Sequence, residues 1–281
     1  MWAIQPEAIS AYEPIIRALH KNPTADVGHL LPKHQDFYYK SINAGASIAY
    51  PKKDRDGNVV GFGDVPKGTV AMIPLSGVVM KNDYCGDMGT STIGNLVNMA
   101  DAHPNIIGSV FITDTPGGAV DGTPVLGNTI SGAKKPIVGY VDGLCCSAGY
   151  WAISGTDHIM AAHQLNTIGS IGVMCAFKDY SKMEESEGIV THTIYATNST
   201  DKNKDYTDAT KGDYSLIQKR LDQMNDMFKS TIQKNRWGAG VSKDVFTGKT
   251  YLAEEAKSKG LIDSIGTLSD AIKLVNQLSK S

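Results

Sequence analysis

The fold is decided by residues 106–119, which read IIGSVFITDTPGGA. The first eight of these residues are mostly apolar and β-branched, a composition typical of a buried strand in a parallel sheet. The last six include a proline and two glycines, so we expect the strand to give way to a tight turn. Ligands of open α/β sheets bind beyond the carboxyl ends of the strands, and this turn is therefore a candidate site.

Strands and helices alternate on both sides of this stretch. We expect strands at residues 70–75, 136–140 and 158–161, a further segment of the same kind at 168–173, and helices at about 91–103, 123–131 and 148–154. Such alternation predicts βαβ units and a mainly parallel sheet. The last third is more helical, because apolar side chains recur at helical spacing between residues 214 and 232.

Residues 1–68 are predicted to be an extension that precedes a domain of residues 69–281. Apolar side chains at helical spacing predict an amphipathic helix over residues 5–20. Four prolines and a charged, glycine-containing stretch follow, so we expect irregular structure there with one small hairpin.

Composition excludes several classes of protein. The chain has 281 residues, of which 41% are hydrophobic and 20% charged, enough apolar material for a real core. Its net charge of −2 disfavours nucleic-acid or anionic-membrane binding. The sequence shows neither a run of about 18 apolar residues nor a secretory signal, so we expect a cytoplasmic protein without a membrane span. We also predict no metal, because zinc spacings and HExxH are absent, and no cofactor.

A second loop that could carry catalytic residues follows the strand expected at 136–140. Residues 142–150 read DGLCCSAGY and place Ser147 at a strand-to-helix turn, where the helix dipole stabilises negative charge. The hydrolase elbow GxSxG does not match, because Cys145 stands where that motif has its first glycine. From the residues alone, a helix-capping serine and a nucleophile both stay open. For Cys145 and Cys146 we favour small-residue packing over a thiol nucleophile.

A serine nucleophile needs a base, and the chain offers two kinds. His158 and His163 keep a Ser-His-Asp arrangement open, because the order of triad members varies between folds. Lys202 and Lys204 lie in the polar stretch 198–206. A lysine acts as a general base only where its pKa is lowered from about 10.4 towards neutrality, and the alternative is an ordinary solvated loop. Two interpretations also stay open for the glycines that follow the strand at 106–113. They either expose backbone amides to an oxyanion or simply form a turn.

Taken together, these motifs resemble the signal peptide peptidase A family of serine–lysine endopeptidases. The resemblance extends over roughly Val70 to Val275. Its motifs are the Asp-Thr-Pro-Gly-Gly loop, the helix start SAGYW at 147–151, GSIGV at 169–173, DYSK at 179–182 and a terminal pattern between residues 248 and 263. It implies an α/β fold of the Clp protease/crotonase type, a superhelix of ββα units with a mainly parallel sheet.

The resemblance also implies the roles of individual residues. Ser147 matches the family's nucleophile, and Ala148 replaces the first glycine of the family's motif. The oxyanion hole corresponds to Gly117 or Gly118 together with the amide of Ala148. The catalytic lysine corresponds to Lys204, with Lys202 as the alternative.

The lysine assignment requires a local shift in the alignment. An ungapped match from residues 194 to 210 would place Thr200 at the catalytic position. Lys204 precedes an aspartate, as in some members of the family, and we therefore prefer it to Lys202.

The resemblance further implies partners. Members of the family form homo-oligomeric rings whose neighbouring subunits enclose the sites, and they cleave polypeptides in extended form. The opening residues 1–8 resemble the phage-encoded branch, which implies capsid, scaffold or portal proteins as partners and a place in the prohead. Signal-peptide-like segments are the other substrates considered. A catalytically impaired capsid-assembly module and a crotonase-like acyl-CoA enzyme are the alternative functions.

Overall fold

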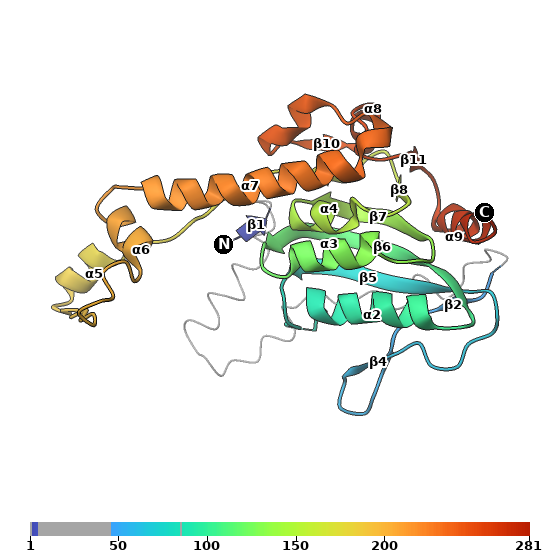
Figure 1. Cartoon of the computed structure of the whole chain (residues 1–281), viewed down its shortest axis with the longest axis horizontal. Helices are drawn as coiled ribbons and strands as arrows, with labels where there is room; N and C mark the ends of the chain where they lie inside the picture. The colour runs from blue at the N-terminus through green and yellow to red at the C-terminus, as the bar shows by residue number, and fades with distance from the viewer. Residues whose placement is uncertain (1, 5–45, 85) are drawn as a thin grey trace.

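The structure, a computed structural model, describes residues 2–4, 46–84 and 86–281. A mainly parallel sheet forms its centre, in the order β10-β9-β7-β6-β5-β2, with β8 beside β7, β11 beside β8 and β1 beside β6 (Figure 1). The prediction of an α/β fold with a mainly parallel sheet is confirmed. The strands are β1 (Trp2–Ile4), β2 (Ile48–Ala49), β5 (Thr69–Val79), β6 (Ile106–Ala119), β7 (Ile137–Cys146), β8 (His158–Ala161), β9 (Thr167–Gly169), β10 (Thr250–Leu252) and β11 (Ser264–Ile265).

Both faces of this sheet are covered by helices. On one face lie α2 (Thr90–Ala102), α3 (Thr123–Ser131) and α4 (Ala148–Ile153), and on the other lies α9 (Leu268–Leu278). Side chains of β6 alternate between the two faces: Phe111 belongs to the core under α2–α4, whereas its neighbours Val110 and Ile112 belong to the core under α9. Burial on both sides explains the near-continuous apolar run in this strand.

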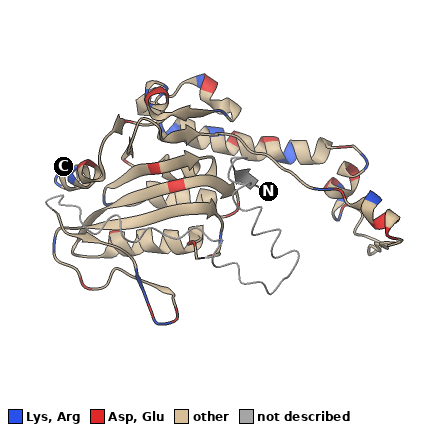
Figure 2. Ribbon diagram, turned by 180° about the vertical axis from the view of Figure 1, so that it is seen from behind, with Lys and Arg blue, Asp and Glu red and all other residues tan. Residues whose placement is uncertain are grey.

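A helical arm extends from this body. Its long helix α7 (Ser215–Asn235) carries α5 (Ser181–Ser186) and α6 (Lys204–Ala209) at the end remote from the sheet (Figure 1). Figure 2 shows both signs of charge along this arm. In α7 only Phe228 and Ile232 are buried, so the helix packs on the body through its C-terminal part alone. Short 3-10 turns (Trp237–Ala239 and Lys243–Thr247), β10 and α8 (Ala253–Ser258) then lead back to the sheet.

The N-terminal extension is described in part. The helix expected over residues 5–20 lies outside the described residues. A hairpin of β3 (Lys52–Lys53) and β4 (Val59–Gly61) stands where a small one is expected, and β2 pairs in parallel with β5 of the central sheet. Among the helices of the described residues, none is both long and apolar enough to cross a membrane.

The two loops singled out in the sequence are largely extended strand. β6 continues through the glycines to Ala119, because Val78 and Val79 of β5 pair with it on one side and β1 on the other. β7 likewise continues to Cys146, because β9 pairs with its last three residues. The expectation that both strands end before these residues is therefore wrong. Glycine and proline signal a turn locally, but pairing with distant segments keeps the backbone extended here.

Candidate active site

Ser147 occupies the turn between β7 and α4. Its backbone has φ +53° and ψ −120°, a conformation that side-chain-bearing residues rarely adopt. Two hydrogen bonds hold the turn: the Ser147 amide donates to the Gly169 carbonyl (2.8 Å), and the Trp151 amide donates to the Ser147 carbonyl (2.9 Å). The nucleophile elbow of α/β-hydrolases also places a serine on a strained strand-to-helix turn, although the GxSxG signature is absent here.

The hydroxyl of Ser147 has no hydrogen-bond partner among the described residues. The residue is only 1% exposed, and its Oγ is buried. A buried hydroxyl without a partner costs about 1–3 kcal/mol, so native proteins rarely contain one without a reason. Backbone strain and a buried, unpartnered hydroxyl at one residue make Ser147 the strongest candidate for a functional group.

The glycines of β6 lie at the same edge of the sheet as this serine. Thr115 pairs with Cys145 across β6 and β7, and two residues further along the two strands come Gly117 and Ser147. α4 also packs closely here, since a Cβ added at Gly149 would lie 2.2 Å from Cγ2 of Thr115. The pairing therefore brings the predicted nucleophile and the predicted oxyanion loop together.

The amides of this edge differ in their existing partners. The Gly117 amide donates to Oγ1 of Thr115 (3.1 Å), and Gly117 has a φ of +99°. Gly118 cannot carry a side chain, because a Cβ there would lie 2.1 Å from the carbonyl oxygen of Val79. Ala148 opens α4, where backbone N–H groups have no partner within the helix. Gly117, Gly118 and Ala148 therefore all lie close to Ser147 in the chain or across the strand pairing, and they stay the predicted oxyanion donors.

The predicted lysines lie on the arm. Lys202 precedes α6 and Lys204 begins it, and both are exposed. Nζ of Lys204 donates to Oδ2 of Asp208 (2.7 Å), and this hydrogen bond, aided by the carboxylate charge, raises the pKa of Lys204. A general base needs the opposite shift. Since Ser147 Oγ has no partner, the described part of one chain does not assemble a Ser–Lys dyad.

The alternative bases and nucleophiles do not hydrogen-bond to the Ser147 hydroxyl either. Nε2 of His158 lies 2.7 Å from Oγ of Ser264, and burial lowers the pKa of this histidine. Nδ1 of His163 accepts from the Leu165 amide. Cys145 and Cys146 are fully buried, and burial raises the pKa of the Cys145 thiol, which favours the packing role.

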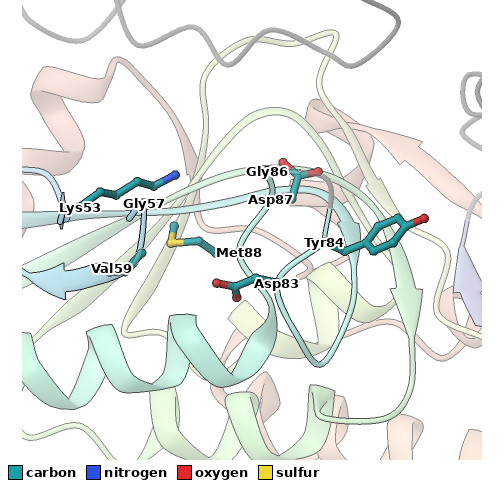
Figure 3. A pocket seen from close by; sticks show the side chains of 8 residues that line it. All are labelled: Lys53, Gly57, Val59, Asp83, Tyr84, Gly86, Asp87 and Met88. Carbon is teal, nitrogen blue, oxygen red and sulfur yellow. The ribbon is translucent and has the colours of Figure 1, made fainter. Parts of the chain in front are cut away.

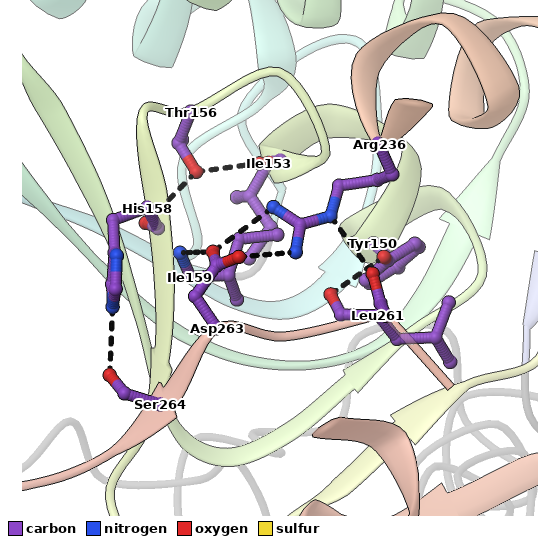
Figure 4. Close-up of polar contacts among 10 residues, drawn as sticks. Tyr150, Ile153, Thr156, His158, Ile159, Arg236, Leu261, Asp263 and Ser264 are labelled. Carbon is purple, nitrogen blue, oxygen red and sulfur yellow. Dashed lines mark hydrogen bonds and ion pairs between the residues drawn. The ribbon is translucent and has the colours of Figure 1, made fainter. Parts of the chain in front are cut away.

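Behind α4 lies a polar cluster that could not be found from the sequence, formed by Tyr150, Arg236, Leu261 and Asp263 (Figure 4). The guanidinium of Arg236, 5% exposed, donates to both carboxylate oxygens of Asp263 at 3.0 and 2.7 Å. The Tyr150 hydroxyl donates to the carbonyl of Leu261 (2.8 Å). Tyr150 and Asp263 belong to motifs quoted above, but nothing in the sequence marks Arg236 as buried.

The same region joins the arm to the nucleophile helix. Trp151 of α4 stacks on Phe228 of α7, with ring centroids 4.5 Å apart and planes 6° apart. Asn235 donates to Oγ of Ser154 (2.9 Å), and Arg236 follows directly at the end of α7. The root of the arm is therefore packed against the helix that begins after Ser147.

We expect Arg236→Met to destabilise the fold by about 3 kcal/mol, because it leaves the half-buried Asp263 carboxylate without its cation. Urea unfolding at pH 7 measures this loss. Lys259→Met is the matched control: it breaks the pair with the exposed Asp244 and should cost much less, because exposed ion pairs contribute little to stability. Equal losses of stability in the two variants would contradict the larger contribution that we assign to the buried Arg236.

The cost of Arg236→Met should also depend on pH. Burial acts to raise the pKa of Asp263, but hydrogen bonds from Arg236 and from the Ile159 amide outweigh it, so the pKa lies below its usual value. A lowered carboxylate pKa contributes stability that is complete above the unfolded value of about 4 and is lost as the pH falls through the folded value. The difference between wild type and variant should therefore shrink in acid.

A pocket of about 210 Å³ lies apart from these residues, between the β3–β4 hairpin and the segment before α2 (Figure 3). Its lining residues are Lys53, Gly57, Val59, Asp83, Tyr84, Gly86, Asp87 and Met88. None of them is a predicted site residue. Within the described ranges, no group of three or more His, Cys, Asp or Glu side chains is arranged to hold a metal ion.

A serine on a strained strand-to-helix turn is an arrangement that serine hydrolases also use. The model of peptidase family S49 matches residues 130–281, more than half of the chain and the part that contains Ser147. The chain therefore belongs to peptidase family S49, the serine peptidases of the Ser–Lys type. The family prediction is confirmed at this level.

Curated relatives carry protease names. "Putative protease MJ0651" of Methanocaldococcus jannaschii is 29% identical over 188 residues, 66% of this chain and 60% of that protein. "Capsid assembly protease C" of Escherichia phage lambda is 27% identical over 73% of this chain and 48% of its own length. "Protease 4" of Salmonella typhi is 26% identical over 76% and 35%, respectively. The matched region thus spans between about one third and three fifths of the length of these three relatives.

Among solved structures, a mutant of the "1510-N membrane-bound stomatin-specific protease" superposes with a TM-score of 0.51. The match covers 74% of this chain and 85% of that chain, at 16% sequence identity. The two proteins share their fold.

Proposed function

We propose that this protein is a serine endopeptidase that cleaves peptide bonds with Ser147 as nucleophile. Its oxyanion hole consists of the amides of Gly118 and Ala148, with Gly117 beside them, and its general base is Lys204. The observation that carries the proposal is the Ser147 hydroxyl, buried, unsatisfied and held on a strained turn next to these glycines. Membership of family S49 supports the same chemistry.

The proposed reaction proceeds through an acyl-enzyme. An unprotonated lysine accepts the proton of Ser147, and Oγ attacks the carbonyl carbon of the scissile bond. The oxyanion receives hydrogen bonds from the two backbone amides, which are fixed by the sheet and by the start of α4 and need no reorganisation. The leaving amine takes the proton from the lysine. Water then attacks the ester and regenerates the serine.

In this proposal, the lysine comes from a neighbouring copy of the chain. The arm, which includes α6 and its first residue Lys204, extends away from α4 (Figure 1). Many large apolar side chains of this arm are exposed. Monomers rarely expose so much apolar surface, whereas subunit interfaces bury it. The exposed side chains are Phe177, Tyr180, Met183, Ile189, Val190, Ile194, Tyr195, Tyr206, Tyr214, Leu216 and Met227. A homo-oligomeric ring would bury the arm, and desolvation would then lower the lysine pKa.

For substrates we propose extended segments of phage capsid or scaffold proteins, cleaved in a prohead. The support is the likeness to "Capsid assembly protease C" of phage lambda. Signal-peptide-like segments are the second candidate, supported by 25% identity over 177 residues to "Putative signal peptide peptidase SppA" of Enterococcus faecium. Incubation with each class of polypeptide, followed by mass spectrometry of the products, decides between them.

A catalytically impaired assembly module is the second candidate function. One observation favours it: within the described part of the chain no lysine contacts the Ser147 hydroxyl. This alternative predicts an inert serine, whereas the endopeptidase predicts an activated one. No feature of the described site supports the acyl-CoA enzyme that the sequence left open as an alternative.

We expect a fluorophosphonate probe to label the full-length assembled protein at Ser147, because only an activated serine reacts with it. Mass spectrometry of the digested protein locates the adduct. Ser170 is the internal control, since it shares the φ of +53° but lies outside the turn before α4. The Ser147→Ala variant should lose all labelling and Ser170→Ala should keep it. Failure of the wild-type protein to label would favour the impaired module.

A further inference from the structure

The edge of β6 beside Ser147 is already paired with another part of the same chain. Up to Thr115, β6 is flanked by β7 on this side; β7 then turns into α4 at Ser147. From Gly117 to Ala119 the place of β7 is taken by β1, which runs antiparallel to β6 (Figure 1). The pairs are Trp2 with Ala119, Ala3 with Gly118 and Ile4 with Gly117.

The opposite edge of two of these β6 residues is also in use. Val78 and Val79 of β5 pair in parallel with Gly117 and Gly118. An incoming strand therefore has one edge of these residues to pair with, the edge on which β7 ends at the nucleophile. Since each backbone N–H and C=O in a ladder serves one neighbour, two strands cannot pair with that edge at once.

We propose that residues 2–4 are an intramolecular competitor of the polypeptide substrate, because they occupy the sheet edge with which an extended peptide beside Ser147 would pair. The inference rests on the proposed endopeptidase function, because it assigns the edge to substrate. Main-chain pairing recognises any extended peptide, and a peptide paired with Gly117–Ala119 lies directly beside the Ser147 turn. The N-terminal segment thus competes with substrate for the site.

The occupant is suited to being displaced. β1 has three residues, and each ladder hydrogen bond contributes only about 0.5–1.5 kcal/mol net. Covalent attachment to the body favours rebinding over capture of a free peptide. If the edge is occupied nine-tenths of the time, the apparent affinity for an added peptide falls about tenfold. The segment therefore restrains the site without closing it permanently.

The test uses the full chain with Trp2→Pro and Ala3→Pro combined. Bonded and non-bonded pairs alternate along an antiparallel ladder, so prolines at two successive positions remove a ladder donor whichever pair is bonded. The control combines Trp2→Val and Ala3→Val, which keeps both N–H groups and suits a strand. Hydrogen exchange of residues 117–119 reports pairing, and binding of the synthetic peptide MWAIQPEA, which copies residues 1–8, reports access.

We expect faster exchange at residues 117–119 in the proline variant than in the valine variant. The proline variant should also bind the peptide about tenfold more tightly, with both variants in a Ser147→Ala background. Its hydrolysis of casein at low concentration, with Ser147 present, should rise by a similar factor. Equal exchange in the two variants would overturn the proposal, and so would faster exchange without tighter binding. Absence of hydrolysis in every variant would count against the endopeptidase, while exchange and binding still decide this inference.

Discussion

Ser147→Ala should abolish peptide hydrolysis, lowering kcat by about 10⁴-fold or more. The substitution removes the only atom that we assign to covalent catalysis, and neither cysteine beside it can take over, since both are fully buried. Stability should not fall. The Ser147 hydroxyl makes no hydrogen bond in the described chain, so its removal takes away an unsatisfied buried group and leaves no partner behind.

The measurement pairs a peptide-hydrolysis assay with thermal unfolding and size-exclusion chromatography. Ser154→Ala is the matched control, because Ser154 is also buried but its hydroxyl is hydrogen-bonded to Trp151 and Asn235. That variant should lose stability and keep measurable activity. Ser147→Gly adds a second reading: it should be inactive yet at least as stable as wild type, since glycine relieves the positive φ. Undiminished cleavage by Ser147→Ala would discard the proposed nucleophile.

Those elements whose signals are local could be predicted from the sequence. The apolar run at 106–113 predicts a buried central strand, and the motif at 147–151 predicts a helix start after the serine; the structure contains both. The glycines of β6 and the turn of Ser147 also meet at one sheet edge. Parallel neighbouring strands necessarily end at the same edge, so motifs placed directly after them come together.

Features set by distant pairing could not be predicted. Gly117 and Gly118 read as a turn, and only β5 and β1, far away in sequence, keep them extended. Arg236 reads as one more charge at the end of a polar helix, because its burial depends on Asp263 and on the carbonyl of Gly260. A local pattern contains no information about such partners.

The environment of the proposed base, Lys204, could not be predicted from the sequence either. A charged loop gives no local sign of whether it will be buried, and in one chain Lys204 is exposed and paired with Asp208. Its ammonium is therefore stabilised, which suits a surface ion pair and not a base. A second copy that covers the arm would change both conditions at once, because it would remove water and compete for the Asp208 contact. In the proposed mechanism, a second copy of the chain therefore supplies the other half of the site.

Lys204→Ala should lower the rate of peptide hydrolysis by about 10²–10⁴-fold, the usual contribution of a general base. Lys204→Arg should fail equally, because a guanidinium does not release its proton near neutral pH. Lys211→Ala provides the control for a neutral change on the same exposed arm and should be nearly silent. If Lys202→Ala loses activity instead, the base is Lys202. If neither lysine matters and His158→Ala or His163→Ala is inactive, a histidine replaces the dyad.

Mixing two inactive variants tests whether the dyad forms between copies. In a random ring of Ser147→Ala and Lys204→Ala chains, about a quarter of the sites combine an intact serine with an intact lysine from the neighbour. After dissociation and reassembly, the mixture should therefore recover about a quarter of the wild-type rate, whereas each variant alone stays inactive. A dyad within one chain predicts no recovery, because every chain lacks one member. Recovery of activity would also explain why the Ser147 hydroxyl, on its strained backbone turn, has no hydrogen-bond partner in the described part of one chain.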